Sequence, residues 1–221
     1  MPKKNNRKQK VLKPVLHIYC EGEKTEPNYL NGYINRYFPS NRRLKVIKIE
    51  ATKKNTPKQL VEEAVNAKTA AKNNGLEDDT FWVVYDRESK QKYADALHSR
   101  TYEKAQKNQV SIALSNVCFE AWLLLHFQDT TASYNCYDDL RSNSALRAEC
   151  KKRGLVDYDK GNKEIFNILE DDDITKARNR AMKINQQTKM SADSSCTKPF
   201  HWNPYTDVHL LLDAIDKLAE Q

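Results

Sequence analysis

The chain has 221 residues, enough for one domain with a sizeable core, and its composition of 39% hydrophobic and 30% charged residues excludes a disordered or fibrous protein. The net charge of +7 suggests a nucleic-acid partner, but six basic residues and no acidic ones lie in residues 1–13, which leaves about +1 for the rest. No apolar stretch approaches the roughly 20 residues of a membrane-spanning helix and the start lacks a secretory signal, so we expect a cytoplasmic protein without membrane contact.

Residues 1–13 are predicted to form a disordered basic tail. Such a tail is either an arm that gains affinity for nucleic acid by counterion release, or a solvated leader without a partner. The sequence favours neither of these two interpretations.

Strand and helix patterns alternate over residues 14–129, which we expect to form an α/β core. Apolar, β-branched and aromatic runs predict strands at residues 15–20, 44–51, 80–86 and 110–115. The first intervening helix is expected to be capped by Thr25, the second by Thr56 together with Gln59, and a third covers residues 90–107. This alternation favours a mostly parallel sheet with helices on both faces.

The remainder, residues 130–221, is predicted to be a helical extension packed on that core. Helical patterns cover residues 136–154, 163–187 and 206–220, the last capped by Thr206, and residues 191–204 are expected to form a loop. The expected fold class is therefore α/β, with a sheet flanked by helices and a helical C-terminal half.

Acidic residues stand where two of the predicted strands end. Glu21 follows the first strand, and Asp86 and Glu88 lie at the end of the third. In an open parallel sheet, functional groups gather at the carboxyl ends of the strands, and the i, i+2 spacing lets an extended backbone point both carboxylates of the pair to one side. We therefore expect these three carboxylates to converge although they are far apart in sequence.

Carboxylates that pack together repel one another and need a compensating cation. Mg²⁺ or Mn²⁺ fits this need, because such an ion takes hard oxygen ligands and requires few protein ligands beside substrate phosphates. The alternative is that Arg87, Lys24 or Lys90 pair with these acids at a wet surface, which is the commoner arrangement for an isolated D-x-E motif.

Further charged residues lie near the same strand ends. Glu120 lies in a segment that is apolar nearly all round, so it either completes the metal shell or pairs with a core tyrosine or arginine. Lys24 opposes the helix macrodipole, which favours a role at a substrate phosphate. Glu23 and Glu26 suit a first helical turn electrostatically and are assigned mainly to it.

Other chemistries find no support in the sequence. It contains no G-x-S-x-G, phosphate-loop or G-x-G-x-x-G motif, which removes the usual hydrolase, NTPase and dinucleotide-binding interpretations. The five histidines lack nucleophile or metal spacing, and the five scattered cysteines are expected to be reduced thiols rather than disulfides or zinc ligands.

Four stretches together carry a resemblance to a known family. They are "CEGEKTEPNYL", "VVYDRES", "SNVCFEAWLLLHF" and "NPYTDVHLLL", which in this order span nearly the whole chain. The chain thereby resembles the RloB-like family, which is similar to Toprim-fold proteins and occurs in prokaryotic defence loci. The resemblance implies a Toprim-like domain with one glutamate after the first strand and an acidic pair after a later one, which together bind Mg²⁺ for phosphodiester chemistry.

The resemblance also implies roles for individual residues. Glu21 matches the glutamate that acts as metal ligand or general acid/base, and Asp86 and Glu88 match the pair, with Glu88 where Toprim sites usually have aspartate. Lys24 and Glu120 join these three ligands as expected catalytic residues.

With neither a topoisomerase tyrosine domain nor a primase zinc module, the implied activity is that of a Mg²⁺-dependent nuclease in antiviral defence, which cuts DNA or RNA beside a partner ATPase. The alternatives are a non-catalytic sensor or adaptor that binds nucleic acid or the ATPase, and a phosphatase or nucleotidyl transferase that uses the same metal site.

Overall fold

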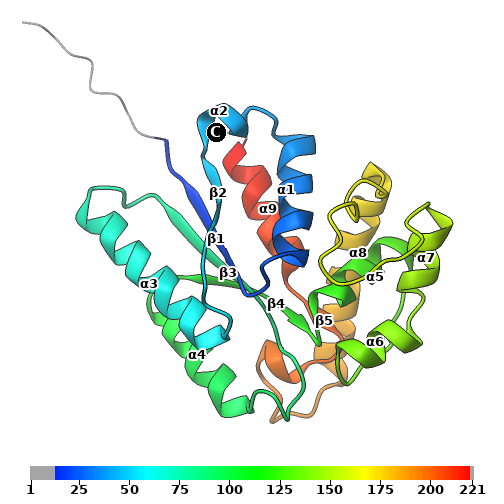
Figure 1. Ribbon diagram of the computed structural model, residues 1–221. Coiled ribbons are helices and arrows are strands. Elements are labelled where there is room, and N and C mark those ends of the chain that lie inside the picture. Colours follow the sequence, from blue (N-terminus) through cyan, green and yellow to red (C-terminus); the bar gives the residue numbers. More distant parts are fainter. Residues whose placement is uncertain (1–12, 220–221) are drawn as a thin grey trace, which may run out of the picture.

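The computed structural model describes residues 13–219, which form a five-stranded sheet with the strand order β2-β1-β3-β4-β5 (Figure 1). The first four strands are parallel and β5 is antiparallel to β4. The strands are β1 (Leu16–Cys20), β2 (Ile47–Glu50), β3 (Thr80–Asp86), β4 (Ser111–Asn116) and β5 (Tyr205–Thr206). The predicted α/β class with a mostly parallel sheet and a helical C-terminal part is confirmed.

The helices connect and cover these strands. They are α1 (Thr25–Tyr37), α2 (Asn41–Leu44), α3 (Pro57–Asn73), α4 (Asp95–Lys107), α5 (Phe119–Phe127), α6 (Tyr137–Asn143), α7 (Leu146–Lys152), α8 (Asp171–Ser191), the short 3-10 helix η1 (Pro199–His201) and α9 (Val208–Ala219). Within residues 13–219, no helix combines the length and the apolar character needed to cross a bilayer.

Each face of the sheet has its own hydrophobic cluster, because successive side chains of a strand point to opposite faces. In β1, Leu16, Ile18 and Cys20 join the cluster that contains α1, α5, α8 and α9. Tyr19 points the other way, into the cluster with α3 and α4. Figure 1 shows α3 and α4 on one side of the sheet and α1 and α9 on the other. Burial on both faces explains why the central strands β1 and β3 are almost continuously apolar.

Two helix starts differ from their predictions. Helix α1 begins at Thr25 itself, because the carbonyl of Lys24 already accepts a hydrogen bond from the Asn28 amide (2.8 Å), so the prediction of Thr25 as the cap is wrong. The Thr56 cap is confirmed, and its hydroxyl oxygen accepts from the Gln59 amide. Helix α4 begins at Asp95, five residues later than predicted.

The C-terminal part departs further from its predicted elements. Residues 136–154 form two helices, and residues 163–170 form turns instead of the first turns of a long helix. Arg36 holds these turns, because its guanidinium donates to the carbonyls of Phe166 (3.1 Å) and Leu169 (2.7 Å). Strand β5 was not predicted and lies beyond residue 129, so this part of the chain contributes to the sheet itself as well as to its cover.

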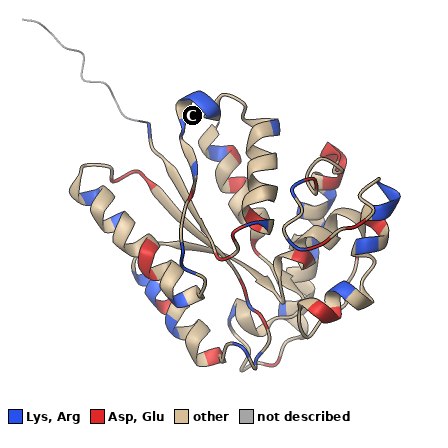
Figure 2. Ribbon diagram, in the orientation of Figure 1, with Lys and Arg blue, Asp and Glu red and all other residues tan. Residues whose placement is uncertain are grey.

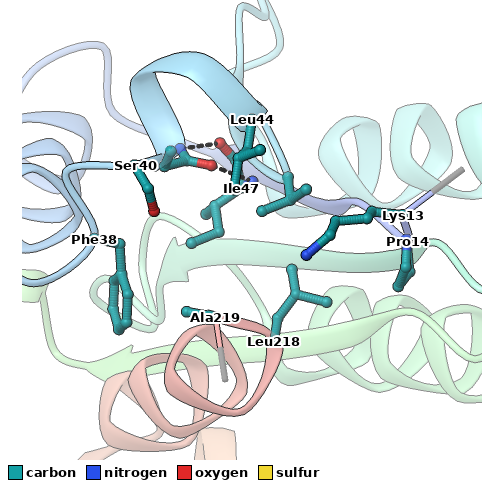
Figure 3. Close-up of a pocket in the computed structure, with 10 residues that line it drawn as sticks. Lys13, Pro14, Phe38, Ser40, Leu44, Ile47, Leu218 and Ala219 are labelled. Carbon is teal, nitrogen blue, oxygen red and sulfur yellow. Dashed lines mark hydrogen bonds between the residues drawn. The ribbon is translucent and has the colours of Figure 1, made fainter. Parts of the chain in front are cut away.

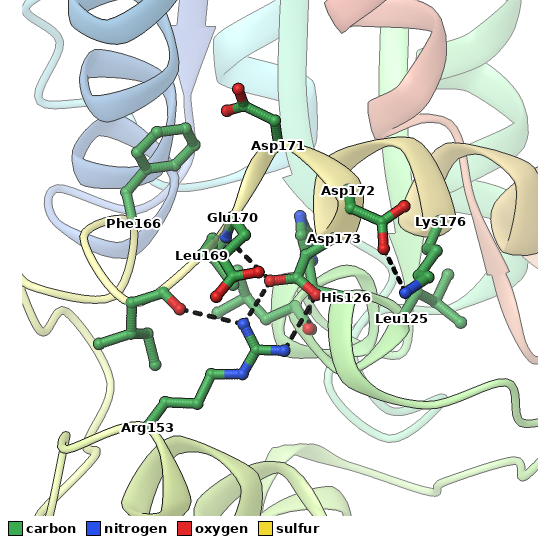
Figure 4. A network of polar contacts seen from close by, with 12 residues as sticks. Leu125, His126, Arg153, Phe166, Leu169, Glu170, Asp171, Asp172, Asp173 and Lys176 are labelled. Carbon is green, nitrogen blue, oxygen red and sulfur yellow. Dashed lines mark hydrogen bonds and ion pairs between the residues drawn. The ribbon is translucent and has the colours of Figure 1, made fainter.

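Arg153 and Asp173 fix the start of α8 (Figure 4). The Arg153 guanidinium donates to both carboxylate oxygens of Asp173, and the Glu170 amide donates to the same carboxylate at 2.9 Å, which forms part of a capping box. Burial acts to raise the pKa of Asp173, but the hydrogen bonds from Arg153 and Glu170 outweigh it and the pKa is lowered.

We expect Asp173→Ala to lower the free energy of unfolding by about 2–3 kcal/mol, since it removes a charge-assisted bidentate pair and a helix cap together. Urea denaturation measures this change. Asp172→Ala is the matched control, because exposed Asp172 pairs with Lys176 one turn later and has no other ion pair within residues 13–219, so its loss should cost under about 0.5 kcal/mol. Equal losses of unfolding free energy in the two variants would contradict the role of Asp173 in fixing the start of α8.

A small pocket lies beside the amino ends of β1 and β2, between α2 and α9 (Figure 3). Asn41 closes one side of it through two hydrogen bonds to the backbone of Ile47, and Leu44 and Leu218 contribute apolar side chains. Its volume of about 60 Å³ is well below the roughly 300 Å³ at which small-molecule sites begin, so it carries no functional assignment.

Other predictions concern the tail and the thiols. Apart from Lys13, the predicted basic tail lies outside the described residues. All five cysteines are free, and Cys20, Cys118 and Cys150 are buried, as expected for reduced thiols that serve as small apolar side chains.

Candidate functional site

A cleft of about 440 Å³ lies at the carboxyl ends of β1 and β3. Its walls carry four carboxylates and two lysines, whereas no acidic residue lines the small pocket at the opposite end of the sheet, among the described residues. The lining residues are Glu21, Gly22, Glu26, Asn55, Thr56, Asp86, Glu88, Lys92, Tyr93 and Lys160. Three of the five predicted site residues, Glu21, Asp86 and Glu88, are among them.

Glu21 and Asp86 meet at the end of the β1–β3 pair. The Glu21 amide continues the ladder by donating to the Val84 carbonyl at 2.9 Å, and the Asp86 amide donates to Oε2 of Glu21 at 3.1 Å. Burial raises the pKa of Glu21 to about 7, although the hydrogen bond from the Asp86 amide acts in the opposite direction. The structure thus brings together two acids that are 65 positions apart.

Together with Glu26, Asp86 is one of two almost fully buried acids among the cleft-lining residues. Its exposed fraction is 4%, and burial followed by the charge of Glu26 raises its pKa well above the ordinary value. Lys160 opposes this shift from 3.8 Å away. A buried carboxylate beside other carboxylates is electrostatically unfavourable, and such an arrangement is typical of a site that binds a cation.

Glu88 lies just beyond β3, where the chain leaves the sheet. Its φ of 58° is in the left-handed region, which is uncommon outside glycine, and its amide donates to the Val117 carbonyl at 2.9 Å. The carboxylate accepts a hydrogen bond from Lys92 Nζ at 2.6 Å. The predicted D-x-E pair therefore lines one cleft, but its second acid has a lysine partner.

Arg87 does not neutralise the site acids, although the surface-pairing alternative named it for that purpose. It is buried, and its guanidinium donates to Asp95 (2.5 Å) and to the carbonyls of Phe200 (3.0 Å) and Tyr93 (2.9 Å). Within residues 13–219, neither Lys24 nor Lys90 forms an ion pair with an acidic residue. The lysines that face the acids are Lys92 and Lys160.

Glu26 lies in the first turn of α1 as predicted, but it is also part of the cleft wall. Its exposed fraction is only 2%, Oε1 accepts from the Gly22 amide at 3.3 Å, and Oε2 has no hydrogen-bond partner among the described residues. Burial raises its pKa, and the nearby charge of Glu120 adds to the shift. Sequence reasoning missed this role because a first-turn glutamate already has a sufficient explanation in the helix dipole.

Glu120 is fully buried and lies behind the cleft, not among its lining residues. Its Oε1 accepts a hydrogen bond from the Tyr158 hydroxyl at 3.5 Å, which is the pairing with a core tyrosine named as an alternative, whereas Oε2 has no partner within residues 13–219. Its negative charge acts on Asp86 and Glu26 by raising the pKa of each. Glu120 can therefore influence the site electrostatically from the second row.

Lys24 is exposed and does not line the cleft. Its aliphatic side chain lies over Gly161, where an added Cβ would come within 2.8 Å of the Lys24 Cβ. The basic residues that line the cleft are Lys92 and Lys160, the latter from the turns between α7 and α8. A single lysine in a polar segment carries no signal by which the sequence could have identified it.

The donor chemistry of the cleft fits a hard divalent cation, because four carboxylates line it and the buried Oε2 of Glu26 has no described partner. The side-chain positions do not form a coordination shell, since within residues 13–219 no group of three His, Cys, Asp or Glu side chains is arranged to hold a metal ion. Lys92 pairs with Glu88 and Lys160 faces Asp86 instead. An ion that binds Glu88 or Asp86 must therefore displace Lys92 or Lys160 from its carboxylate.

A wider groove of about 590 Å³, between α1, α8 and α9, is a weaker candidate. Its central charges satisfy one another: Arg178 donates to Asp213 (2.6 Å), to Asp216 (2.7 Å) and to the Tyr33 hydroxyl (2.6 Å). A network whose members are paired in this way stabilises the contact between helices and leaves little to recognise a ligand.

Comparison with known proteins gives one positive result. The family model described as RloB-like protein matches residues 16–215, which includes every residue that lines the cleft. No curated protein and no solved structure matches the chain. Because the match covers nearly the whole chain, this protein belongs to the RloB-like protein family.

Proposed function

We propose that this protein is a metal-dependent nuclease, and the observation that carries the proposal is the meeting of Glu21 and Asp86 in a cleft that Glu26 and Glu88 also line. Acids delivered by different strand ends to one partly closed space suit phosphodiester hydrolysis. The resemblance to Toprim-like proteins points to the same reaction class.

Each residue of the cleft would have a role that depends on its position. Glu21, Asp86 and Glu88 would hold the ion, and Glu26 adds an oxygen donor that the sequence did not suggest. Bound Mg²⁺ or Mn²⁺ would activate a water molecule and neutralise charge on the scissile phosphate. Buried Glu120 would set the electrostatic potential behind Asp86. Lys92 and Lys160, the two lysines that line the cleft, would contact the substrate phosphate.

The setting of the activity follows from the family resemblance and the composition. We propose that the enzyme acts in the cytoplasm in antiviral defence, cuts DNA or RNA, and works beside a partner ATPase. The loops around the cleft favour an anionic polymer, because Lys53, Lys54 and Lys90 are exposed near the lining residues Asn55 and Lys92.

Metal dependence tests this function directly. Purified protein is incubated with DNA, messenger RNA and transfer RNA in the presence of Mg²⁺, Mn²⁺ or EDTA, alone and with the partner ATPase. We expect cleavage of at least one polymer with metal and its abolition by EDTA, because the acids need a cation before they can approach a phosphate. No metal-dependent cleavage under any of these conditions would contradict the proposal.

One observation favours a second function, a non-catalytic sensor or adaptor: two of the four cleft acids, Asp86 and Glu88, already have lysine partners, and the acids form no coordination shell among the described residues. Glu21→Gln discriminates between the two. If protection of cells survives this substitution in a folded protein, the adaptor function is favoured. A phosphatase or nucleotidyl transferase would convert nucleotides in a metal-dependent manner when these replace the polymers in the same assay.

A further inference from the structure

Lys160 differs in origin from the other charges of the cleft. It comes from the turns between α7 and α8, while the acids come from the ends of β1 and β3 and from α1. Its ammonium lies 3.8 Å from Oδ2 of Asp86 and 5.0 Å from the centroid of the Tyr137 ring. The C-terminal part of the chain thus supplies a cation to a site built by the α/β part.

The backbone that carries Lys160 is anchored. Asn28 of α1 donates to the Gly161 carbonyl at 3.0 Å, and Gly161 has a φ of +84° that favours glycine. On the other side, the buried Tyr158 donates to Glu120 of α5. The turn therefore fixes where the Lys160 side chain begins, while the side chain itself is 42% exposed.

The pairing with Asp86 is electrostatic and is not locked by a hydrogen bond, because 3.8 Å exceeds hydrogen-bonding distance. A lysine side chain carries a positive charge at neutral pH, so Lys160 places a cation opposite the carboxylates that a divalent ion would need.

We propose that Lys160 competes with the divalent cation for Asp86, and that on metal binding its ammonium moves from Asp86 to the substrate phosphate. The inference rests on the proposed function and specifies how its site is controlled. Two cations about 4 Å apart repel each other, so Lys160 and a divalent ion each weaken the binding of the other to one carboxylate. A flexible lysine on an anchored turn can leave Asp86 without any change in the fold.

Calorimetric titration of the full-length protein with Mn²⁺ alone measures its Mn²⁺ affinity. It tests the competition without any activity measurement. We expect Lys160→Met to bind Mn²⁺ about tenfold more tightly than the wild type, since a repelling charge is removed. Lys160→Arg keeps the charge and should stay within about twofold. Lys163→Met is the matched control, because it removes an exposed lysine of the same segment that does not line the cleft, and its Mn²⁺ affinity should be unchanged.

Inorganic phosphate tests the second half of the exchange. Added to the Mn²⁺-saturated protein, it should bind about fivefold more weakly to Lys160→Met than to the wild type, because a charge-assisted contact is missing. A residue with a purely structural role would not move the two affinities in opposite directions. Thermal melting establishes that each variant is folded.

The possible failures can be told apart. If Lys160→Met binds Mn²⁺ no more tightly than the wild type does, or if its affinity for phosphate is unchanged, the exchange is overturned while the metal site stands. If neither the wild type nor Lys160→Met binds Mn²⁺ at millimolar concentration, the proposed metal-dependent function fails, and the exchange fails with it.

Discussion

Asp86→Asn is expected to abolish metal-dependent cleavage and to make the protein more stable at the same time. The lost ligand should cost roughly a thousandfold in kcat/KM, about 4 kcal/mol of transition-state stabilisation. Stability should rise because Asn removes a buried charge that lies among Glu26, Glu120 and Glu21. The backbone amide of residue 86 still donates its hydrogen bond to Glu21. A gain of about 1 kcal/mol corresponds to an increase in Tm of about 2–4 °C for a chain of this size.

Nuclease assays and thermal melting of the same preparation measure the two effects. Asp78→Asn is the control, since Asp78 is an exposed acid two residues before the start of β3, at the end of the strand away from the cleft. This substitution should alter neither the cleavage rate nor the Tm. Cleavage that persists in Asp86→Asn would exclude Asp86 as a metal ligand. A fall in Tm would show that the pair with Lys160 outweighs the repulsion among the acids.

The sequence predicted best those elements whose local pattern and tertiary environment agree. Strand β3 lies at its predicted position, Thr80–Asp86, because it is buried on both faces and consists almost entirely of β-branched and aromatic residues. Strand β5 has only two residues and owes its existence to pairing with β4, so no periodicity could reveal it. The turns at residues 163–170 have a helical pattern, but tertiary hydrogen bonds from Arg36 hold their carbonyls.

The same distinction holds for the site. The approach of Glu21 to Asp86 follows from topology, because parallel neighbouring strands end at one edge of the sheet. The contributions of Glu26 and Lys160 depend on side-chain packing around the cleft and on a turn far along the chain. Lys24 illustrates the converse, since its unfavourable position at a helix start suggested function, whereas the structure shows it packed over Gly161.

Arg87→Met is expected to be the most destabilising single substitution considered for this protein. Arg87 is 2% exposed, and its guanidinium joins the end of β3 to α4 through Asp95 and to η1 through the Phe200 carbonyl. Methionine fills much of the same volume but leaves these acceptors without their donor. Asp95 is 44% exposed and stays hydrated, but the carbonyls of Phe200 and Tyr93 lose their donor at about 1–3 kcal/mol each, so we expect a cost of about 3–4 kcal/mol.

Urea denaturation of Arg87→Met should therefore show a loss of about 3–4 kcal/mol in the free energy of unfolding. Arg100→Met on the exposed side of α4 is the matched control and should stay within about 0.5 kcal/mol of the wild type. Arg87 directly precedes Glu88, whose amide donates to the Val117 carbonyl and whose carboxylate pairs with Lys92. Loss of the Arg87 hydrogen bonds should therefore also displace the Glu88–Lys92 pair and weaken Mn²⁺ binding. If Arg87→Met bound Mn²⁺ like the wild type despite its lower stability, the acids would be positioned by the β1–β3 ladder alone, without help from the buried arginine.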